Sequence, residues 1–408
     1  MKLLLLSARN LLRNPRRTFI TGLAIAGGLA LMVVGINLNA GQYGTMIRNG
    51  ISVLAGHVVV QAPGWQKDRK VEQLVADADP IAAELAAAWP DAVITRRIWV
   101  DGLLTSPTSS AGVAITGVDP VPEAAVGQVD TQIVEGRWLS GEGKGLVVGV
   151  GLAKSLGVGL GDKVVYLGQH GDEMTSRLFR VEGIFRTGAA DIDGFLAYVP
   201  LEAARALLDA PGSAHQVALH LDDPNASDAA EARVRGMVGD RAEVLGWRAA
   251  IPEIDGMIRV DKKANDVLMS VLGTIVAIGV LNTVLMSVME RVREFGVLMA
   301  IGMKPRRLAS MILLEGLLLG LFAVTAGVAA GTALSYPLVV DGIDVTKLSG
   351  GEAMSTAGVV LDAVMYAAWD PVRVGRYAVM GVALSVLAAA WPAWRVTRYR
   401  PIEALHHR

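Results

Sequence analysis

The sequence has no cysteine among its 408 residues. This absence excludes disulfide bonds, thiolate metal sites and a cysteine nucleophile. Charged residues are scarce at 19%, and a net charge of −1 excludes a nucleic-acid binder that depends on net basic charge. The sequence has only six Phe but 46 Gly, which favours close helix packing over a bulky aromatic core. Its 52% apolar content excludes a disordered chain.

A phosphate-binding loop of the form G-x-x-x-x-G-K-[ST] is also missing. Gly143-Lys144 is followed by another glycine and lacks the glycine upstream. We therefore expect no cofactor in this chain and no enzymatic activity of its own. Residues 348–352 (LSGGE) are close to the signature of transport ATPases. That motif acts only beside a phosphate loop, so we interpret it as a Ser/Gly turn.

Long apolar stretches are abundant instead. Four of them are long enough to cross a bilayer, which takes about 20 residues. The first is too long for the apolar region of a cleaved signal peptide, which spans about 7–15 residues. We expect transmembrane spans at residues 19–40, 264–289, 308–336 and 376–394.

Basic residues indicate which side of the membrane each segment faces. Residues 1–18, 290–307 and 395–408 carry five, five and four Lys or Arg, with few acids. Residues 41–262 carry 20 basic and 29 acidic residues, and residues 337–375 carry two and five. Lys and Arg concentrate in short cytoplasmic loops. We therefore expect the first three segments to be a cytoplasmic N-terminal segment, elbow and tail, and the other two to be an extracytoplasmic domain and loop.

The 41–262 segment is interpreted as a folded α/β domain. Short apolar runs predict strands, and longer amphipathic runs between them predict helices. The fold class is thus an α-helical membrane protein with four transmembrane helices, N-in and C-in, and an α/β extracytoplasmic domain between the first two. Strands are expected at 57–61, 92–100, 145–150, 163–167, 177–183 and 216–221, and helices at 79–88, 201–208 and 228–238.

Two polar motifs of this domain favour structural roles over metal binding. His215 and His220 lie five residues apart, which places them on opposite faces of a strand. We therefore expect two separate surface histidines. The run Asp191-Ile192-Asp193-Gly194 is similar to a calcium loop, but with Gly194 at the invariant glycine of loop position 6, no Glu stands at position 12. A turn before a strand is the better interpretation, and no metal site is predicted.

Asn282 and Glu315 are polar residues within the apolar spans. Glu315 follows Arg307 by eight residues, about 12 Å along a helix, which places it near the inner boundary of the membrane. We expect Glu315 to reach the interface or to pair with a basic residue of the elbow. The alternative is a buried ion pair inside the helix bundle.

The elbow, residues 290–307, combines charges with an apolar face. Gly302 can end a short helix, and Pro305 suits the start of the next one. Such an elbow can project into the cytoplasm as a docking handle, or it can be an ordinary amphipathic segment on the membrane surface. Its charges at the membrane exit are Glu290, Arg291, Arg293 and Glu294, and its apolar face is Val297, Leu298 and Ile301.

This region resembles the FtsX-like, MacB-type permease superfamily of ABC systems, and most closely its lipoprotein-releasing branch. The N-terminal run 9–18 (RNLLRNPRRT) and Gly56-His57-Val58 resemble that branch, as do Gly151-Leu152-Ala153, Leu156-Gly157 and Gly161-Asp162. The other matching residues are Asn282, Ser287, Glu290-Arg291, Arg293-Glu294, Gly296, Ala300-Ile301-Gly302, Glu315-Gly316, Pro392-Ala393, Arg395 and the run 400–405 (RPIEAL).

The resemblance implies a multi-pass permease of the cell inner membrane with its large domain in the periplasm. It implies a dimer with a second permease copy or paralogue, and a separate ABC ATPase subunit that holds ATP-Mg. The elbow, from Glu290 to Gly302, would couple ATP-driven motion to the extracytoplasmic domain. Lipoprotein or lipid is the implied cargo, with a periplasmic carrier or adaptor as a further partner, and no nucleic acid is involved.

Two alternatives remain open at the level of the sequence. One is efflux of small amphiphiles with a periplasmic adaptor. The other is mechanotransmission, in which the outside domain activates a cell-wall hydrolase or a sensor and nothing is transported. An apolar cleft that faces the bilayer would favour extraction, and an exposed apolar patch on the outside domain would favour signalling.

Overall fold

The computed structural model describes residues 15–127, 129–141, 143–170, 173–223, 226–344, 355–356, 359–360 and 364–398. The chain forms two compact units. A helical unit contains residues 1–44, 259–343 and 364–408, and a second unit, here called the domain, contains residues 45–258 and 344–363. The expected 348–352 turn lies outside the described residues.

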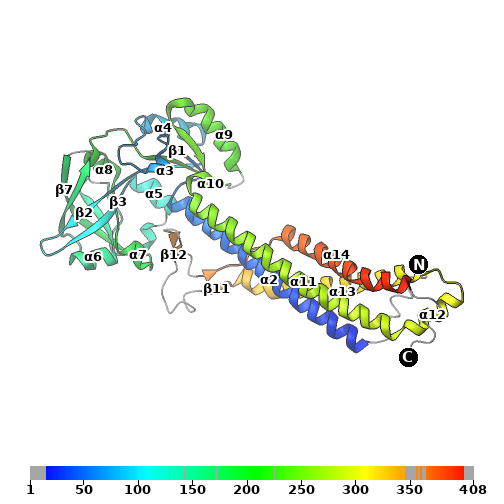
Figure 1. The fold of residues 1–408 in the computed structure, drawn as a ribbon. Coiled ribbons are helices and arrows are strands. Elements are labelled where there is room, and N and C mark those ends of the chain that lie inside the picture. Colours follow the sequence, from blue (N-terminus) through cyan, green and yellow to red (C-terminus); the bar gives the residue numbers. More distant parts are fainter. Residues whose placement is uncertain are drawn as a thin grey trace. The chain divides into compact units, whose positions relative to one another are not determined.

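The helical unit contains four helices that are long and apolar enough to cross a membrane. They form an elongated bundle in which α13 packs closely on α14 (Figure 1). Helices α2 and α11 continue beyond the expected spans because apolar residues define the membrane-crossing part of a helix, not its ends. The bounds are α2 (Pro15–Val53), α11 (Pro252–Glu290), α13 (Pro305–Val340) and α14 (Pro371–Thr397), with the short α12 (Val292–Ala300) between α11 and α13.

Glycines on α13 allow close contact with α14. A β-carbon at Gly316 would lie 2.5 Å from the Cβ of Ala389, and one at Gly320 would lie 2.7 Å from the Cβ of Ser385. Atoms cannot approach this closely, so only glycine fits at either position. The Gly-x-x-x-Gly spacing places both glycines on one face of the helix.

A second pair of glycines on α13 packs against α2. A β-carbon at Gly327 would lie 2.7 Å from the Cβ of Leu29, and one at Gly331 would lie 2.6 Å from the Cβ of Val33. Helix α13 is thus the helix on which α2 and α14 both pack. The expectation of close helix packing through glycine is confirmed at these positions.

The domain is built on a ten-stranded sheet in the order β10-β1-β9-β2-β3-β8-β5-β7-β4, in which β6 pairs with both β2 and β7. Strands β2, β3, β8, β5, β7 and β6 therefore close into a ring. The β3–β8 and β5–β7 pairs are parallel and the other pairs are antiparallel. The strands are β1 (Val58–Gln61), β2 (Val93–Thr105), β3 (Ser110–Val118), β4 (Ile133–Gly136), β5 (Gly145–Gly149), β6 (Lys163–His170), β7 (Glu173–Phe185), β8 (Leu196–Pro200), β9 (Gln216–His220) and β10 (Glu243–Gly246).

Helices cover this sheet and enclose its core. Helix α4 packs on β2 and β9, α8 packs on β2 and β3, and α9 packs on β10 and β1 (Figure 1). Ile81, Leu85, Ile98 and Val217 are fully buried between them. The domain helices are α3 (Trp65–Asp68), α4 (Ala78–Ala88), α5 (Pro120–Gly127), α6 (Val150–Leu156), α7 (Ala190–Asp193), α8 (Leu201–Leu208), α9 (Ser227–Val238) and α10 (Trp247–Ala250). Two further pairs of short strands lie outside this sheet. They are β11 (Ile343–Asp344) with β14 (Val364–Met365) and β12 (Ser355–Thr356) with β13 (Val359–Val360).

All six expected strands and three expected helices of the domain are present, but β3, β4, β8 and β10 were not predicted. Strand β2 also continues through Asp101-Gly102, where the sequence favoured an end. A β-carbon at Gly102 would lie 2.4 Å from the ring of Tyr166 and 2.6 Å from the carbonyl oxygen of Leu167. Gly102 therefore allows a neighbouring strand to approach closely and does not form a turn.

Candidate functional site

The elbow between α11 and α13 is built on the short helix α12. Helix α12 ends in a Schellman motif: the Met303 N–H donates to the Leu298 carbonyl at 2.9 Å, and the Gly302 N–H donates to the Met299 carbonyl at 3.0 Å. Gly302 has a φ of 100°, which a side chain would strain. Pro305 then begins α13, as the sequence predicted.

The predicted apolar face of the elbow is divided in two. Ile301 is 79% exposed and Val297 is 44% exposed, so both face outward. Leu298 is instead half-buried and packs with Met303 against the core of the bundle. The expectation of one shared face is therefore wrong for Leu298, because Phe295 anchors this side of α12 in the bundle.

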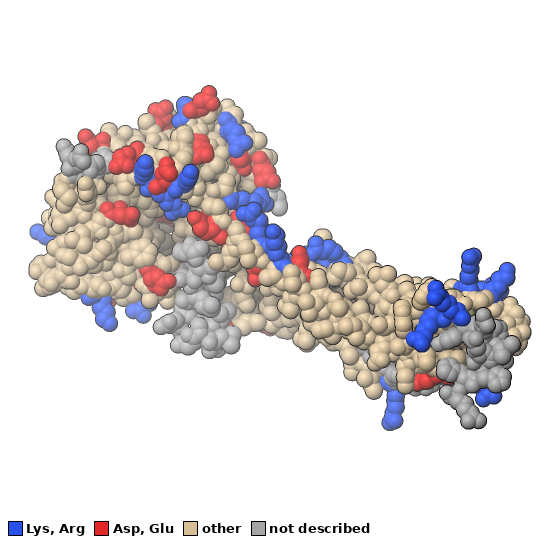
Figure 2. Space-filling view, in the orientation of Figure 1, with Lys and Arg blue, Asp and Glu red and all other residues tan. Residues whose placement is uncertain are grey.

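Exposed charges surround this outward-facing surface, which we call the elbow surface (Val297 and Ile301 with the charges around them). Figure 2 shows Lys and Arg side chains gathered at the end of the helical unit that carries α12. The first turn of α2 and the last turns of α14 lie at the same end (Figure 1). The exposed charged residues here are Glu290, Arg293, Lys304, Arg306 and Arg307, while Arg291 and Glu294 are partly buried.

A buried ion pair connects the elbow to α13. Arg291 donates through Nη1 to Glu315 Oε1 at 3.1 Å and through Nε to Glu294 Oε2 at 3.0 Å. The side chains of Arg291 and Glu315 are 11% and 6% exposed, and the Arg291 guanidinium also lies 5.3 Å from the ring centre of Phe295. Glu315 therefore pairs with a basic residue of the elbow, as expected, and it does so inside the bundle, as the alternative proposed.

Asn282 lies on the outward face of α11 and not inside the bundle. It belongs to an exposed stripe in which residues recur every three or four positions, as on one face of a helix. The apolar members of this stripe are Leu268, Val271, Ile275, Ile278, Met286 and Met289.

A further polar residue of the bundle, Asn37, was missed. It is 1% exposed. Its Nδ2 donates to Ser335 Oγ at 3.1 Å, and its backbone carbonyl accepts from the Ala368 N–H at 2.9 Å. Asn37 thus joins α2 to α13 and to the segment before α14. The signal in the sequence was the pair of carboxamides Asn37 and Asn39 within the predicted span 19–40, where a buried polar group needs partners.

The two histidines that were expected at the surface are buried, so that expectation is wrong. His215 and His220 are 1% and 7% exposed. His215 Nδ1 accepts from the Trp99 N–H at 3.0 Å, while its Nε2 lies 2.9 Å from the Val71 carbonyl. His215 lies just before β9, and the rings of Trp65 and Trp99 lie against it. His220, the last residue of β9, has its Nε2 3.0 Å from the Thr95 hydroxyl.

The 191–194 run forms the one-turn helix α7 before β8 and not a calcium loop. The Asp193 carboxylate accepts from the N–H groups of Thr187 and Gly188, at 2.8 and 3.2 Å. The Asp193 carboxylate therefore stabilises the turn at Thr187 and Gly188. Among the residues that the structure describes, no group of three or more acidic or histidine side chains could hold a metal ion.

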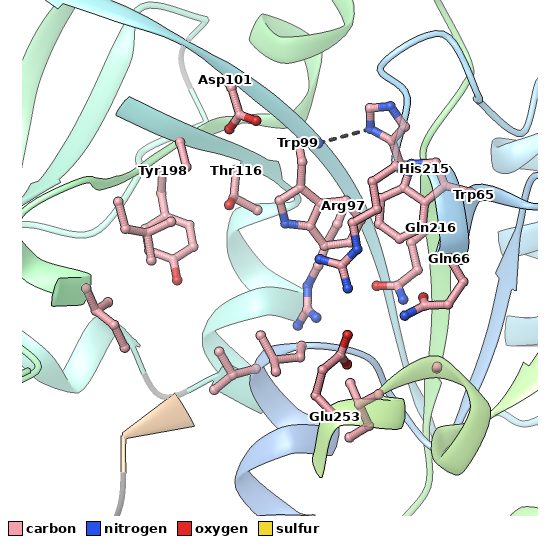
Figure 3. Close-up of a pocket in the computed structure, with 18 of the residues that line it drawn as sticks. Trp65, Gln66, Arg97, Trp99, Asp101, Thr116, Tyr198, His215, Gln216 and Glu253 are labelled. Atoms are coloured by element: carbon pink, nitrogen blue, oxygen red, sulfur yellow. Dashed lines mark hydrogen bonds between the residues drawn. The ribbon is translucent and has the colours of Figure 1, made fainter. Parts of the chain in front are cut away.

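The domain contains a pocket that the sequence did not predict. The rings of Trp65 and Trp99 stack at 5.0 Å between centres, and the His215 ring lies 5.7 Å from Trp65. Beside them lies Arg97 (Figure 3). Arg97 forms a buried ion pair with Glu123, at 2.8 and 3.0 Å. These residues come from α3, β2, α5 and the start of β9, so no local motif connects them.

Acidification is expected to destabilise the domain. Burial lowers the pKa of His57, His215 and His220 below the ordinary value of about 6.5. Above that value both the folded and unfolded chains hold these rings neutral. Below it the unfolded chain binds protons that the folded chain excludes, so stability falls as pH falls, by up to about 1.4 kcal/mol per pH unit for each histidine.

Thermal melting of the full chain in detergent, followed by tryptophan fluorescence, should therefore show a lower Tm at pH 5.5 than at pH 7.5. His57 Nδ1 accepts from the Leu221 N–H at 3.0 Å. The variant His57→Asn keeps an acceptor near this position but cannot titrate, so it should show a smaller pH dependence. An equal Tm at both pH values would contradict the assignment of these rings as neutral.

Two protein-family models match the chain. The FtsX-like permease C-terminal model matches residues 267–401, and the MacB-like periplasmic core domain model matches residues 18–237. The chain is an FtsX-like permease with a MacB-like periplasmic core domain. The first match contains the elbow of the permease, and the second contains Trp65 and Trp99 of the pocket. The resemblance read from the sequence is confirmed.

The permease is similar over nearly its whole length to curated lipoprotein-releasing proteins. It is 23% identical to the lipoprotein-releasing system transmembrane protein LolC of Neisseria meningitidis over 410 residues, covering 97% of this chain and 96% of the relative. It is 24% identical to LolC of Xylella fastidiosa over 415 residues, covering 97% and 95%. For LolE of Haemophilus influenzae the identity is 23% over 421 residues, covering 96% and 95%.

Among solved structures, the periplasmic region of MacB from Actinobacillus actinomycetemcomitans matches with 13% identity and a TM-score of 0.37. The match covers 50% of this chain and 95% of that structure.

Proposed function

We propose that this protein is the permease subunit of an ABC transporter that releases lipoproteins from the inner membrane. The observation that carries the proposal is the match to LolC and LolE proteins over at least 95% of both chains. This match includes the helices, the elbow and the domain, so it extends to the complete architecture. Neither small-amphiphile efflux nor mechanotransmission has comparable support.

The proposed orientation places the elbow and both termini in the cytoplasm and the domain in the periplasm. In support of this, the described parts of the three basic segments, residues 15–18, 290–307 and 395–398, lie at one end of the helix bundle (Figure 1), and basic residues concentrate on the cytoplasmic side of membrane spans. A separate ATPase subunit that holds ATP-Mg then docks on the elbow surface. Its motion reaches α13 through the Arg291–Glu315 pair, which fixes the elbow to that helix.

The exposed stripe of α11 is the proposed contact with a second permease copy or paralogue. The six apolar side chains of the stripe need no partner other than lipid. Asn282, which is polar, lies among them. A carboxamide in hydrocarbon is costly unless another polar group satisfies it, and a partner helix can supply that group. Lipoprotein or its lipid is the proposed cargo, with transfer to a periplasmic carrier.

Single cysteines test the orientation, because the native chain has none. Cysteine at the exposed positions Lys304 and Arg398 should resist a membrane-impermeant thiol reagent in intact cells whose outer membrane has been permeabilised. Cysteine at Asp130 or Val372, also exposed, should react. Reaction at Lys304 before lysis would contradict the four-span orientation.

Reconstitution tests the cargo. The permease is incorporated with its ATPase subunit into liposomes that hold a triacylated lipoprotein, and soluble carrier is added. We expect release of lipoprotein into the supernatant only with ATP-Mg. Export of an amphiphilic dye without lipoprotein release would favour efflux, and ATP hydrolysis that moves neither would favour mechanotransmission.

A further inference from the structure

The pocket of the domain has the form of a binding site for a small molecule. Its volume is about 530 Å³, which lies in the range of small-molecule sites. The stacked Trp65 and Trp99 rings form part of its wall. Leu54, just after α2, and Ile254 in the first turns of α11 form another part. A flat apolar group can therefore be enclosed between aromatic and aliphatic side chains.

Three buried polar atoms of this pocket have no hydrogen-bond partner in the described part of the chain. They are Arg97 Nη1 and Gln66 Nε2, which donate, and Gln216 Oε1, which accepts. Arg97 and Gln216 are only 1% and 2% exposed. Buried polar groups are nearly always paired in folded proteins, and leaving one unpaired is costly. The three side chains lie on the same side of the pocket, beside Trp65 and Trp99 (Figure 3).

The charge of the pocket favours an uncharged ligand. The Arg97 charge is already neutralised by Glu123, which accepts from both Nε and Nη2. Asp101 and Glu253 also line the pocket and would repel an anion, and Arg69, whose guanidinium lies 5.6 Å from the Trp65 ring centre, offsets one of these two negative charges. The buried unpartnered atoms supply two donors and one acceptor, which is the complement of a carboxamide.

We propose that this pocket binds a small uncharged molecule that carries a planar apolar group and a carboxamide. The amide oxygen accepts from Arg97 Nη1 and Gln66 Nε2, and the amide N–H donates to Gln216 Oε1. The planar group packs against Trp65 and Trp99. The pocket contains no residue of the elbow surface, and the proposal rests on the pocket's own side chains, so it does not depend on the proposed function.

Phenylacetamide is a suitable probe, and phenylacetate is a charged control of the same shape. The full chain in lipid nanodiscs is titrated with each, and binding is followed by saturation-transfer NMR and tryptophan fluorescence, with empty nanodiscs as the blank. We expect saturable binding of phenylacetamide with a Kd on the order of 1 mM, as for a small fragment. Phenylacetate should bind at least about tenfold more weakly, as repulsion from the pocket carboxylates predicts.

Gln61 offers a matched control within the same sheet. It pairs directly with Gln216 across β1 and β9, is fully buried, and also has an unpartnered Oε1. Gln61 does not line the pocket. Gln216→Met should weaken phenylacetamide binding by about tenfold, the effect of one lost hydrogen bond, whereas Gln61→Met should leave the Kd within about twofold.

Near-UV circular dichroism confirms that each variant is folded. If Gln216→Met does not fold, Gln66→Met on α3 removes a donor of the same site and should weaken binding to a similar degree. The proposal is overturned if the wild-type chain shows no saturable binding, if phenylacetate binds as tightly, or if Gln61→Met weakens binding as much as Gln216→Met.

Discussion

The variant Ile301→Glu is expected to separate the permease from its ATPase subunit and to abolish ATP-driven release. Ile301 is 79% exposed on the elbow surface, so the change places no charge inside the permease itself. In the complex, however, the new carboxylate would be desolvated in the groove that receives Ile301. A charge buried at an interface without a partner costs about 2–5 kcal/mol. The affinity should therefore fall by about 30-fold or more.

Co-purification of the tagged permease with its ATPase, together with the rate of stimulated ATP hydrolysis, measures this effect. Val372 provides a control, because it is 80% exposed, also β-branched, and lies at the other end of the membrane spans in the proposed orientation. Val372→Glu should keep both the complex and the hydrolysis rate. Ile301→Met should also keep them, because the side chain remains apolar.

On the basis of the structure, the largest effect on ATPase binding is predicted for charged variants of Ile301 and Val297, and not for those of Leu298. Leu298 packs against the core of the bundle, so Leu298→Glu would destabilise the permease directly. Loss of the ATPase in that variant could not be separated from unfolding. Full recovery of the ATPase with Ile301→Glu and with Val297→Glu would mean that the elbow surface does not dock, and the coupling proposal would have to be dropped.

The variants Arg291→Leu and Glu315→Leu are each expected to lower the free energy of unfolding by about 3–5 kcal/mol. Each one breaks a buried ion pair: Arg291→Leu leaves the buried Glu315 carboxylate without Arg291, and Glu315→Leu leaves Arg291 with the part-exposed Glu294 as its counter-charge. The double variant should recover most of this stability, because replacing both members of a buried pair by apolar residues is often neutral or stabilising. A strong coupling energy between the two sites is therefore predicted.

Thermal and denaturant unfolding of the purified permease in detergent measures these changes. Arg293 is a matched control, since it lies two residues from Arg291 on the same elbow but is exposed. Arg293→Leu should change stability by less than about 0.5 kcal/mol. Additive losses in the double variant would show that Glu315 does not depend on Arg291. In that case α13 would be connected to the elbow by packing alone.

The two predictions examine different steps of one proposed mechanism. The Ile301 variant tests the contact with the ATPase. The Arg291 and Glu315 variants test the transfer of motion from the elbow to α13. If transmission requires the charges themselves, the double variant should regain stability and ATPase binding but not lipoprotein release. If the pair is only structural, release should return with stability.

Some features of the permease followed from the sequence because they depend on neighbouring residues. The length of an apolar run decides whether a helix can cross a membrane, and the basic residues beside it indicate an orientation. Gly302 and Pro305 marked the end of α12 and the start of α13 for similarly local reasons. The elbow could therefore be located, and the charged residues in it identified, before any contact was known.

The tertiary structure decided which side chains meet, because those contacts join residues that are far apart in the chain. Asn37 and Ser335 are 298 residues apart, and Arg97 and Glu123 come from separate elements. His215 and His220 are buried against residues from other elements, Trp65 and Thr95, which alternation along one strand could not reveal. In the same way, packing of α12 on the bundle exposes Ile301 and covers Leu298, although the two are three residues apart. Local periodicity predicts a helix face, but the elements packed around that helix decide which part of the face is left to bind a partner.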